Sequence, residues 1–213
     1  MDRRRHYLEI AFELFTAHGF HGVSIDQIVS AAGGSKATLY RYFSSKEELF
    51  EAIIVDLTEA TVEDRSVDQL AALDLEEGLR TIGHATARAA LSEQATVFFR
   101  LAAGELNRFP RLARVFFERG PAVSYERLRE FLAAQVAAGE LEIDDLQIAA
   151  EQFLGGIVGH QQLRRALGRQ AAGRRGIDAR VEAAITTLLA VYRPREGRPR
   201  PRGRRAQASE RLR

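Results

Sequence analysis

The chain has 213 residues, of which 46% are hydrophobic, and it contains no cysteine. This length permits one large domain or two modest ones with a real core, and the lack of cysteine excludes disulfides and thiolate metal sites. The net charge of +2 is unevenly placed, because residues 193–213 hold nine Arg and two Glu, a net +7, and residues 1–192 therefore carry −5. Positive surface for an acidic partner must be sought in local segments.

Up to Tyr192 the sequence predicts an all-α protein, because it shows no period-two strand pattern and no Asn-Gly or Asp-Gly hairpin turn. A second helix is predicted to begin at Ser24, where Gln27 completes a capping box, and to stop at the Gly33-Gly34 pair. Before it, a first helix ends at Gly19 and has these apolar residues at helical spacing: Leu8, Ala11, Phe12, Leu14 and Phe15.

The next two helices follow closely. A third helix is predicted from Ser35 to about Phe43, and a helix this short must pack on its neighbours to be stable. A fourth helix is predicted to begin at Ser45, where Glu48 completes another capping box, and to continue to about Glu59.

Later helices are delimited by glycine and proline. The polar stretch 59–69 is either the frayed end of the fourth helix or a linker. We expect a first domain over residues 1–60, a larger helical domain over 61–192, and an Arg-rich tail over 193–213 that has too few apolar residues to fold. The predicted helices of the second domain are 74–91, 93–108, 111–118, 121–138, 145–169 and 178–192.

The second and third helices have the layout of a helix-turn-helix over about residues 24–43, in which the second helix of the unit lies in the DNA major groove. Cations there can neutralise phosphates, serines at helix starts present free amides, and Thr or Tyr offer hydroxyls. A solvated basic face with half-buried tyrosines is the alternative interpretation. The candidate contacts to double-stranded DNA are Ser24, Ser35, Lys36, Thr38, Tyr40, Arg41, Tyr42 and Lys46.

The stretch AFELFTAHGFHGVSIDQIVSAAGGSKATLYRYFSSKEELF resembles the N-terminal domain of the TetR/AcrR family of transcriptional regulators. The resemblance covers about residues 6–55 and includes G-x-x-x-V-S-I-x-x-I, A-G-G-S-K-A-T-L-Y-R-Y-F and S-K-E-E-L-F in order and spacing. It implies an all-helical homodimer with three DNA-reading N-terminal helices and a larger effector-binding domain. By position it implies the DNA contacts named above, apart from Ser35.

Two positions depart from the family pattern. The family often has His at the position of Tyr42, and a bulky aromatic residue or Tyr at that of Arg41. Arg41 either reads a guanine bidentately or holds a phosphate, so the base preference stays open. Residues 98–145 resemble the C-terminal domains of AefR-like regulators more loosely.

A two-fold dimer would present two reading helices to a palindromic operator whose half-sites are roughly 34–36 Å apart. Glycine in a helix interior costs about 1 kcal/mol, so three glycines in residues 150–167 suggest a close helix contact that compensates. That contact is either a dimer seam, which we favour and which agrees with the family, or packing within one subunit. The seam candidates are Gly155, Gly156, Gly159, Leu163, Ile185, Leu188 and Leu189.

The middle of the chain is rich in phenylalanine, and adjacent pairs cannot both face one way on a helix. Most of these rings are expected in the core, while some can line an apolar cavity in which a few polar groups orient a ligand. The candidates for a pocket that binds an unknown small-molecule effector are His84, Phe98, Phe99, Arg100, Phe116, Tyr125, His160 and Gln161.

Other functions fit less well. The chain has no Gly-rich phosphate loop, no H-E-x-x-H and no cysteine nucleophile, so we predict neither an enzyme nor a cofactor or metal. Glu9 and Glu13 interrupt the first apolar run, so we do not expect a signal peptide there. The most apolar window, 148–160, is too short to span a bilayer. We therefore expect a soluble, cytoplasmic homodimer that represses transcription and is released from DNA by an effector. The alternatives are a regulator without an effector, an activator, or a helical interaction protein. The tail is either an additional phosphate contact or inert.

Overall fold

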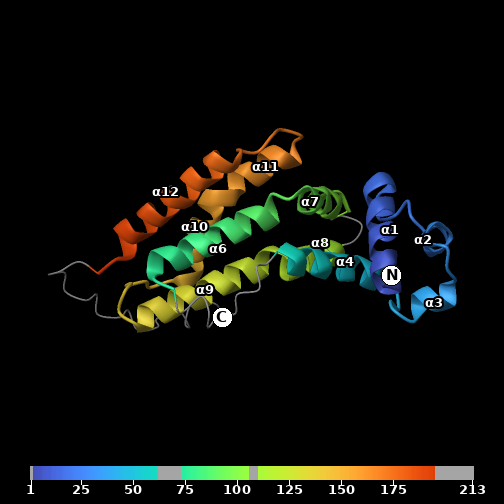
Figure 1. The fold of residues 1–213 in the computed structure, drawn as a ribbon, viewed down its shortest axis with the longest axis horizontal. Coiled ribbons are helices and arrows are strands. Elements are labelled where there is room, and N and C mark those ends of the chain that lie inside the picture. Colours follow the sequence, from blue (N-terminus) through green and yellow to red (C-terminus); the bar gives the residue numbers. More distant parts are fainter. Residues whose placement is uncertain (1, 62–72, 106–109, 195–213) are drawn as a thin grey trace, which may run out of the picture.

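The computed structural model describes residues 2–61, 73–105 and 110–194, and every regular element within those ranges is a helix, as predicted. Figure 1 shows an elongated molecule whose first three helices gather at one end, with a fourth leading into the rest of the bundle. These helices are α1 (Arg3–His18), α2 (Ile25–Ala32), α3 (Lys36–Tyr40) and α4 (Lys46–Thr61).

Local sequence explains where α1 and α2 begin and end. Asp2 caps α1 by accepting a hydrogen bond from the Arg4 amide at 3.0 Å, and Gly19 ends it at φ 74°, a left-handed angle that suits glycine. The Ser24 hydroxyl accepts a hydrogen bond from the backbone amide of Gln27 at 3.2 Å. In return, the side-chain oxygen Oε1 of Gln27 accepts from the backbone amide of Ser24 at 2.7 Å. The predicted end of α1 and the first capping box are therefore confirmed.

The third helix is shorter than predicted: it ends at Tyr40 and not near Phe43. The Tyr42 and Phe43 amides both donate to the Leu39 carbonyl, at 2.9 and 3.0 Å, which tightens the chain into a turn.

The second capping box is also only partly as predicted. The Glu48 amide donates to the Ser45 hydroxyl at 3.0 Å, as expected. The Glu48 carboxylate accepts from the amide of Ser44 at 2.6 Å, one residue earlier than a capping box requires.

The later helices lie close to their predicted positions, with two differences. The helix predicted over 145–169 contains a π-helical turn, η1, whose first two residues are the adjacent glycines Gly155 and Gly156. The last helix begins at Arg174, four residues early, because Gly173 is its N-cap. Of the polar stretch 59–69, residues 59–61 belong to α4, while residues 62–69 and the tail from residue 195 lie outside the described residues. The elements are α6 (Leu75–Ala90), α7 (Glu93–Glu105), α8 (Pro110–Arg119), α9 (Pro121–Ala137), α10 (Leu146–Leu154), η1 (Gly155–Gly159), α11 (His160–Ala166) and α12 (Arg174–Tyr192).

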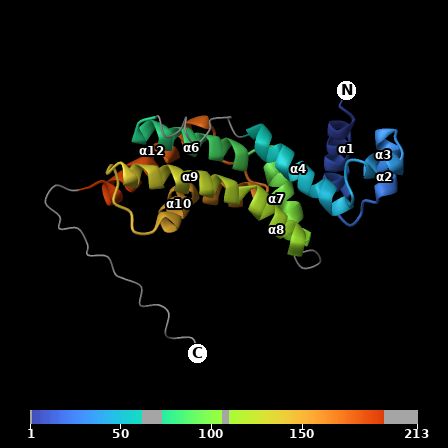
Figure 2. The same cartoon turned by 90° about the horizontal axis from the view of Figure 1, so that it is seen from below.

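Two buried apolar clusters hold the fold together. One lies among the four helices α1, α2, α3 and α4 and includes Phe98 of α7. The ring of Phe98 stacks on that of Phe12, with centroids 5.3 Å apart, and its centroid lies 4.9 Å from that of Phe50. The other joins α6, α9, α10, η1 and α12. Because α4 packs on both α1 and α8, it links the N-terminal helices to the remaining bundle, as Figure 2 shows from below.

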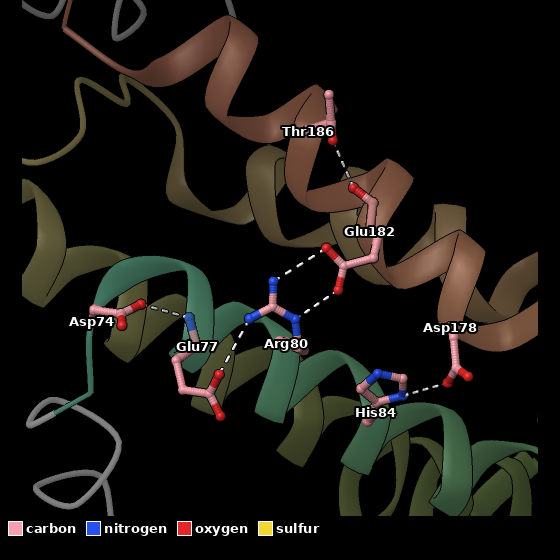
Figure 3. Close-up of polar contacts among 7 residues, drawn as sticks. All are labelled: Asp74, Glu77, Arg80, His84, Asp178, Glu182 and Thr186. Carbon is pink, nitrogen blue, oxygen red and sulfur yellow. Dashed lines mark hydrogen bonds and ion pairs between the residues drawn. The ribbon is translucent and has the colours of Figure 1, made fainter. Parts of the chain in front are cut away.

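Polar contacts join α6 to α12 on the outside of the second cluster (Figure 3). Arg80 of α6 donates to both carboxylate oxygens of Glu182, at 2.6 and 3.2 Å, and to Glu77 at 3.2 Å. One turn along α6, Nδ1 of His84 lies 3.8 Å from the Asp178 carboxylate. Among the described helices none is long and apolar enough to cross a bilayer.

Candidate nucleic-acid interface

The turn between α2 and α3 is built for close approach to α1. Gly33 ends α2 at φ 63°, in the left-handed region. At Gly34 a Cβ atom would lie 2.1 Å from the Tyr7 hydroxyl, so any side chain there would force α1 away from the turn. These two glycines fix how α3 is held against its supporting helices.

One face of α3 is buried and the other is open. Leu39 is fully buried and Phe43, just after the helix, is 1% exposed. Tyr40 and Tyr42 are 49% and 40% exposed, although both are large aromatic residues. Arg41 is also exposed. The rigid support and the outward tyrosines and cation are what a helix that enters a DNA groove requires.

Serines begin α2 and α3, as the sequence predicted. Ser35 accepts from the Thr38 amide at 3.2 Å, and its hydroxyl lies 2.9 Å from the Thr38 hydroxyl. Ser24 is exposed at the start of α2. Both hydroxyls are thus engaged locally, and the remaining amides of each first turn offer donors to an anion.

The two lysines of this region have different surroundings. Nζ of exposed Lys36 lies 2.8 Å from the Asp26 carboxylate, and this hydrogen bond raises the pKa of Lys36. Nζ of Lys46 donates to the carbonyl oxygens of Phe20 and Val23, at 2.8 and 2.9 Å. Lys46 therefore ties the start of α4 to the connection between α1 and α2.

The structure adds a basic group that the sequence reasoning did not select. Arg3, Arg4 and Arg5 form the exposed first turn of α1, and the Arg4 guanidinium carbon lies 5.5 Å from the ring centre of Phe43. In Figure 1 this end of α1 lies near α3. The consecutive arginines were a visible signal, but only the fold places them beside the reading helix.

A small apolar cavity of about 100 Å³ lies between α4 and the second cluster. Among the described residues that line it none is charged; its polar groups include Thr86, Ser124, Tyr125 and Gln162. Burial raises the pKa of Tyr125, so the phenol stays protonated over a wide pH range. The cavity suits a neutral, mainly apolar molecule.

The eight candidate pocket residues do not gather in one place. Phe98, Phe116 and Tyr125 line the cavity. Arg100 donates from Nε to the Ala166 carbonyl at 2.9 Å, and the buried Gln161 accepts from the Ala172 amide at 2.7 Å. The others are placed as follows: Phe99 is half-buried with its ring 6.1 Å from that of Phe116, His160 is exposed, and His84 faces Asp178.

Comparisons with known proteins agree with this architecture. A model of bacterial regulatory proteins of the tetR family matches residues 8–53, and the model described as AefR-like transcriptional repressor, C-terminal domain, matches residues 77–194, more than half of the chain. The solved structure of the flavonoid-responsive regulator FrrA is 38% identical, with a TM-score of 0.78 over 91% of this chain and 98% of its own. The chain belongs to the TetR family of transcriptional regulators. It is therefore a DNA-binding regulator and not an enzyme, as the sequence predicted.

Two further relatives of this TetR-family regulator show how the likeness is distributed. A TetR regulator from Agrobacterium tumefaciens is 27% identical, with a TM-score of 0.72 over 91% of this chain and 95% of its own. The transcriptional activator FasR of Mycolicibacterium smegmatis is 43% identical over only 53 residues. The chain spans about a quarter of the length of the curated relatives it matches.

The regulator exposes an unusual strip along α10, η1 and α11. Ile148 and Leu163 are 48% and 55% exposed, although both are apolar. A Cβ atom at Gly155, Gly156 or Gly159 would meet nothing within 4 Å. The seam candidates on α12 are placed differently: Ile185 and Leu188 are buried in the second cluster, and Leu189 packs against it.

Proposed function

We propose that this TetR-family protein is a homodimeric repressor whose α3 helices bind a palindromic operator and which a small, neutral, largely apolar effector releases. The exposed, rigidly supported face of α3 carries the DNA-binding part of the proposal. Repression is supported by the matched C-terminal model, which describes AefR-like repressors. The activator FasR matches only over a short stretch, so it is a weaker guide to the sign of regulation.

The DNA contacts we propose fall into two groups. Exposed Tyr40 at the end of α3, with Arg41 and Tyr42 in the turn that follows, reaches base edges or phosphates, while Thr38 and the first-turn amides after Ser35 contact phosphates. The second group consists of phosphate contacts from Ser24 at the start of α2, Lys36 and the arginines of the first turn of α1. For Lys46 we propose a positioning role, because its ammonium already binds two carbonyls.

Selection of bound fragments from random DNA by the purified protein tests this proposal and gives the operator. A palindrome with half-sites about one helical turn apart is expected. Arg41→Gln then separates the two roles of this residue. If Arg41 reads a guanine, the variant relaxes the preference at one position of each half-site. If it holds a phosphate, affinity falls for all sequences and the slope of log K against log salt shrinks by about 0.9 per lost contact.

Arg114→Gln is the matched control, since Arg114 is an exposed arginine on α8, away from α3. It should leave both the preference and the salt slope unchanged. Loss of operator binding in the control and not in Arg41→Gln would contradict the assignment of α3 as the reading helix.

The dimer is supported by the exposed strip on α10, η1 and α11. Ile148 and Leu163 are large apolar side chains that this face leaves about half exposed, and the glycines between them leave open space at their Cβ positions. The absence of side chains at Gly156 and Gly159 lets another helix approach closely. The partner we propose is a second copy of the chain, which supplies the second α3. On α12 the surface that meets it includes Ala183 and Thr187, which are exposed.

The effector proposal rests on the cavity beside α4. Its neutral lining favours an uncharged molecule with a few hydrogen-bonding groups, and FrrA is by its name flavonoid-responsive. Pockets for drug-sized ligands have volumes of about 300–1,000 Å³, far more than the 100 Å³ of this cavity. Binding must therefore enlarge the cavity, and Ile54 of α4 is one of its walls. Movement of α4 would re-space the two reading helices, so effector and operator should weaken each other equally.

A titration with a panel of flavonoids, with and without operator DNA, tests the coupling. An effector is expected to bind less tightly to the DNA complex, by the same factor by which it weakens operator binding. Ala95→Phe fills part of the cavity wall and should abolish the response while leaving operator binding intact. Equal affinity for free and DNA-bound protein would overturn the repression-by-release mechanism.

A further inference from the structure

A second basic region lies far along the chain from the reading helix. Residues 163–176, LRRALGRQAAGRRG, contain five arginines and no acid, within a part of the chain that is acidic overall. This stretch covers the end of α11, the connection to α12 and the first turn of α12. In Figure 1 the connection lies well away from α3. Neither the operator contacts nor the apolar cavity uses these arginines.

The arginines converge on a groove of about 730 Å³ between the end of α6 and the α11–α12 connection. Arg88 lines it from α6, Arg165 from α11 and Arg174 from the first turn of α12. Among the described residues that line the groove, Asp178 is the one acid. Its carboxylate faces His84 of α6. Three arginines from three helices thus line one hollow.

Contacts within the subunit hold the walls of this groove in place. Arg165 donates from Nη1 to the Leu91 carbonyl at the end of α6. The connection is pinned by Arg164, whose Nε donates to the Gln170 carbonyl at 3.0 Å, and by the bond from the Ala172 amide to Gln161 at 2.7 Å. The His84–Asp178 pair beside the neighbouring Arg80–Glu182 pair fixes α6 against α12 (Figure 3). The shape of the groove is therefore supported by contacts among the chain's own residues.

The lining has the chemistry of a phosphate site. A guanidinium group presents five N–H donors in a planar fork that matches two phosphate oxygens, so a single bond from Arg165 to a carbonyl leaves its fork largely usable. The start of α12 reinforces this, because Gly173 gives no side-chain cap and the first turn holds Arg174 and Arg175 and no acid. We infer that this groove binds a small phosphate-bearing ligand, most simply a diphosphate, at a site separate from both the operator surface and the apolar cavity.

A small ligand fits the shape better than a nucleic acid does. An open hollow of about 730 Å³ between three helices and a connection is within the usual size range for small-molecule sites. DNA backbones instead follow extended, outward-facing positive surfaces such as the one at α3 and the first turn of α1. This site does not depend on the proposed effector, so the two can succeed or fail independently.

Calorimetric titration of the full chain with inorganic pyrophosphate, in chloride buffer at constant ionic strength, tests the inference. Saturable binding with one site per chain is expected. Arg174→Gln and Arg88→Gln should each weaken it about tenfold or more, the loss expected for a charge-assisted hydrogen bond. Arg175→Gln is the matched control, because its exposed residue has the same charge and the same helical turn but does not line the groove. It should change the affinity less than twofold.

Three results would overturn the inference. One is the lack of saturable binding at millimolar pyrophosphate. Another is an equal loss in Arg174→Gln and Arg175→Gln, which would show a general charge effect instead of a site. The third is a fall in operator affinity in Arg174→Gln but not in Arg175→Gln, which would make DNA phosphate the occupant of the groove.

Discussion

The proposed dimer seam can be tested with one glycine. Gly156 lies in η1, is exposed, and has no atom within 4 Å of the place a Cβ would occupy. Within the subunit a Cβ atom there meets nothing and the position is exposed, so we expect Gly156→Leu to leave the fold intact. In a dimer that packs through this strip, the same side chain must enter a close helix contact twice, once from each subunit.

The magnitude follows from separating the two effects. Replacing a helical glycine gains about 0.8–1.0 kcal/mol of helix propensity, but this gain is the same in monomer and dimer and cancels in the dissociation equilibrium. Overfilling a packed contact costs about 1–3 kcal/mol per site, so two sites cost about 2–6 kcal/mol of dimer stability. The dimer dissociation constant should therefore rise roughly 30-fold to 20,000-fold, since about 1.4 kcal/mol is tenfold.

Sedimentation equilibrium over a dilution series measures this constant. The matched control is Gly104→Leu, because Gly104 of α7 also has open space around its Cβ position and lies off the strip. The control should dimerise like the parent chain. If Gly156→Leu and Gly104→Leu dissociate at the same concentration, the strip is not the seam and the reasoning from open glycines fails.

Three further predictions concern stability measured by urea unfolding. Gly78→Ala should destabilise the fold by about 1–3 kcal/mol, because its Cβ would lie 2.2 Å from Cζ of buried Phe131; a gain of stability, as helix propensity alone demands, would contradict this. Glu182→Gln should cost at most about 1 kcal/mol at pH 7, since the pair is largely exposed. The hydrogen bond from Arg80 lowers the pKa of Glu182, so this contribution is present above the ordinary carboxyl pKa and is lost as pH falls through the lower folded value. The variant and parent should thus converge in acid, and a constant difference down to about pH 2 would refute the assignment. Lys46→Met should cost about 1–3 kcal/mol by removing two charged hydrogen bonds to backbone carbonyls, and an unchanged unfolding midpoint would contradict the positioning role proposed for Lys46.

The N-terminal helices were largely predictable because their signals are local. Ser24 with Gln27, the left-handed glycines and the apolar spacing of α1 act within one or two turns of the chain, so a linear reading recovers them. The third helix was overestimated because its end depends on Phe43 being drawn into the core under α1, which is a tertiary contact.

The sequence by itself determined the all-helical class, the helix boundaries to within a few residues and the family, since these depend on local patterns and residue order. Only the tertiary structure decided which faces meet. It placed Lys46 on carbonyls more than twenty residues earlier, buried Ile185 and Leu188 within the subunit, and brought Arg88 and Arg174 to the same groove. Such contacts join residues far apart in the chain, and their geometry is set by how whole helices pack.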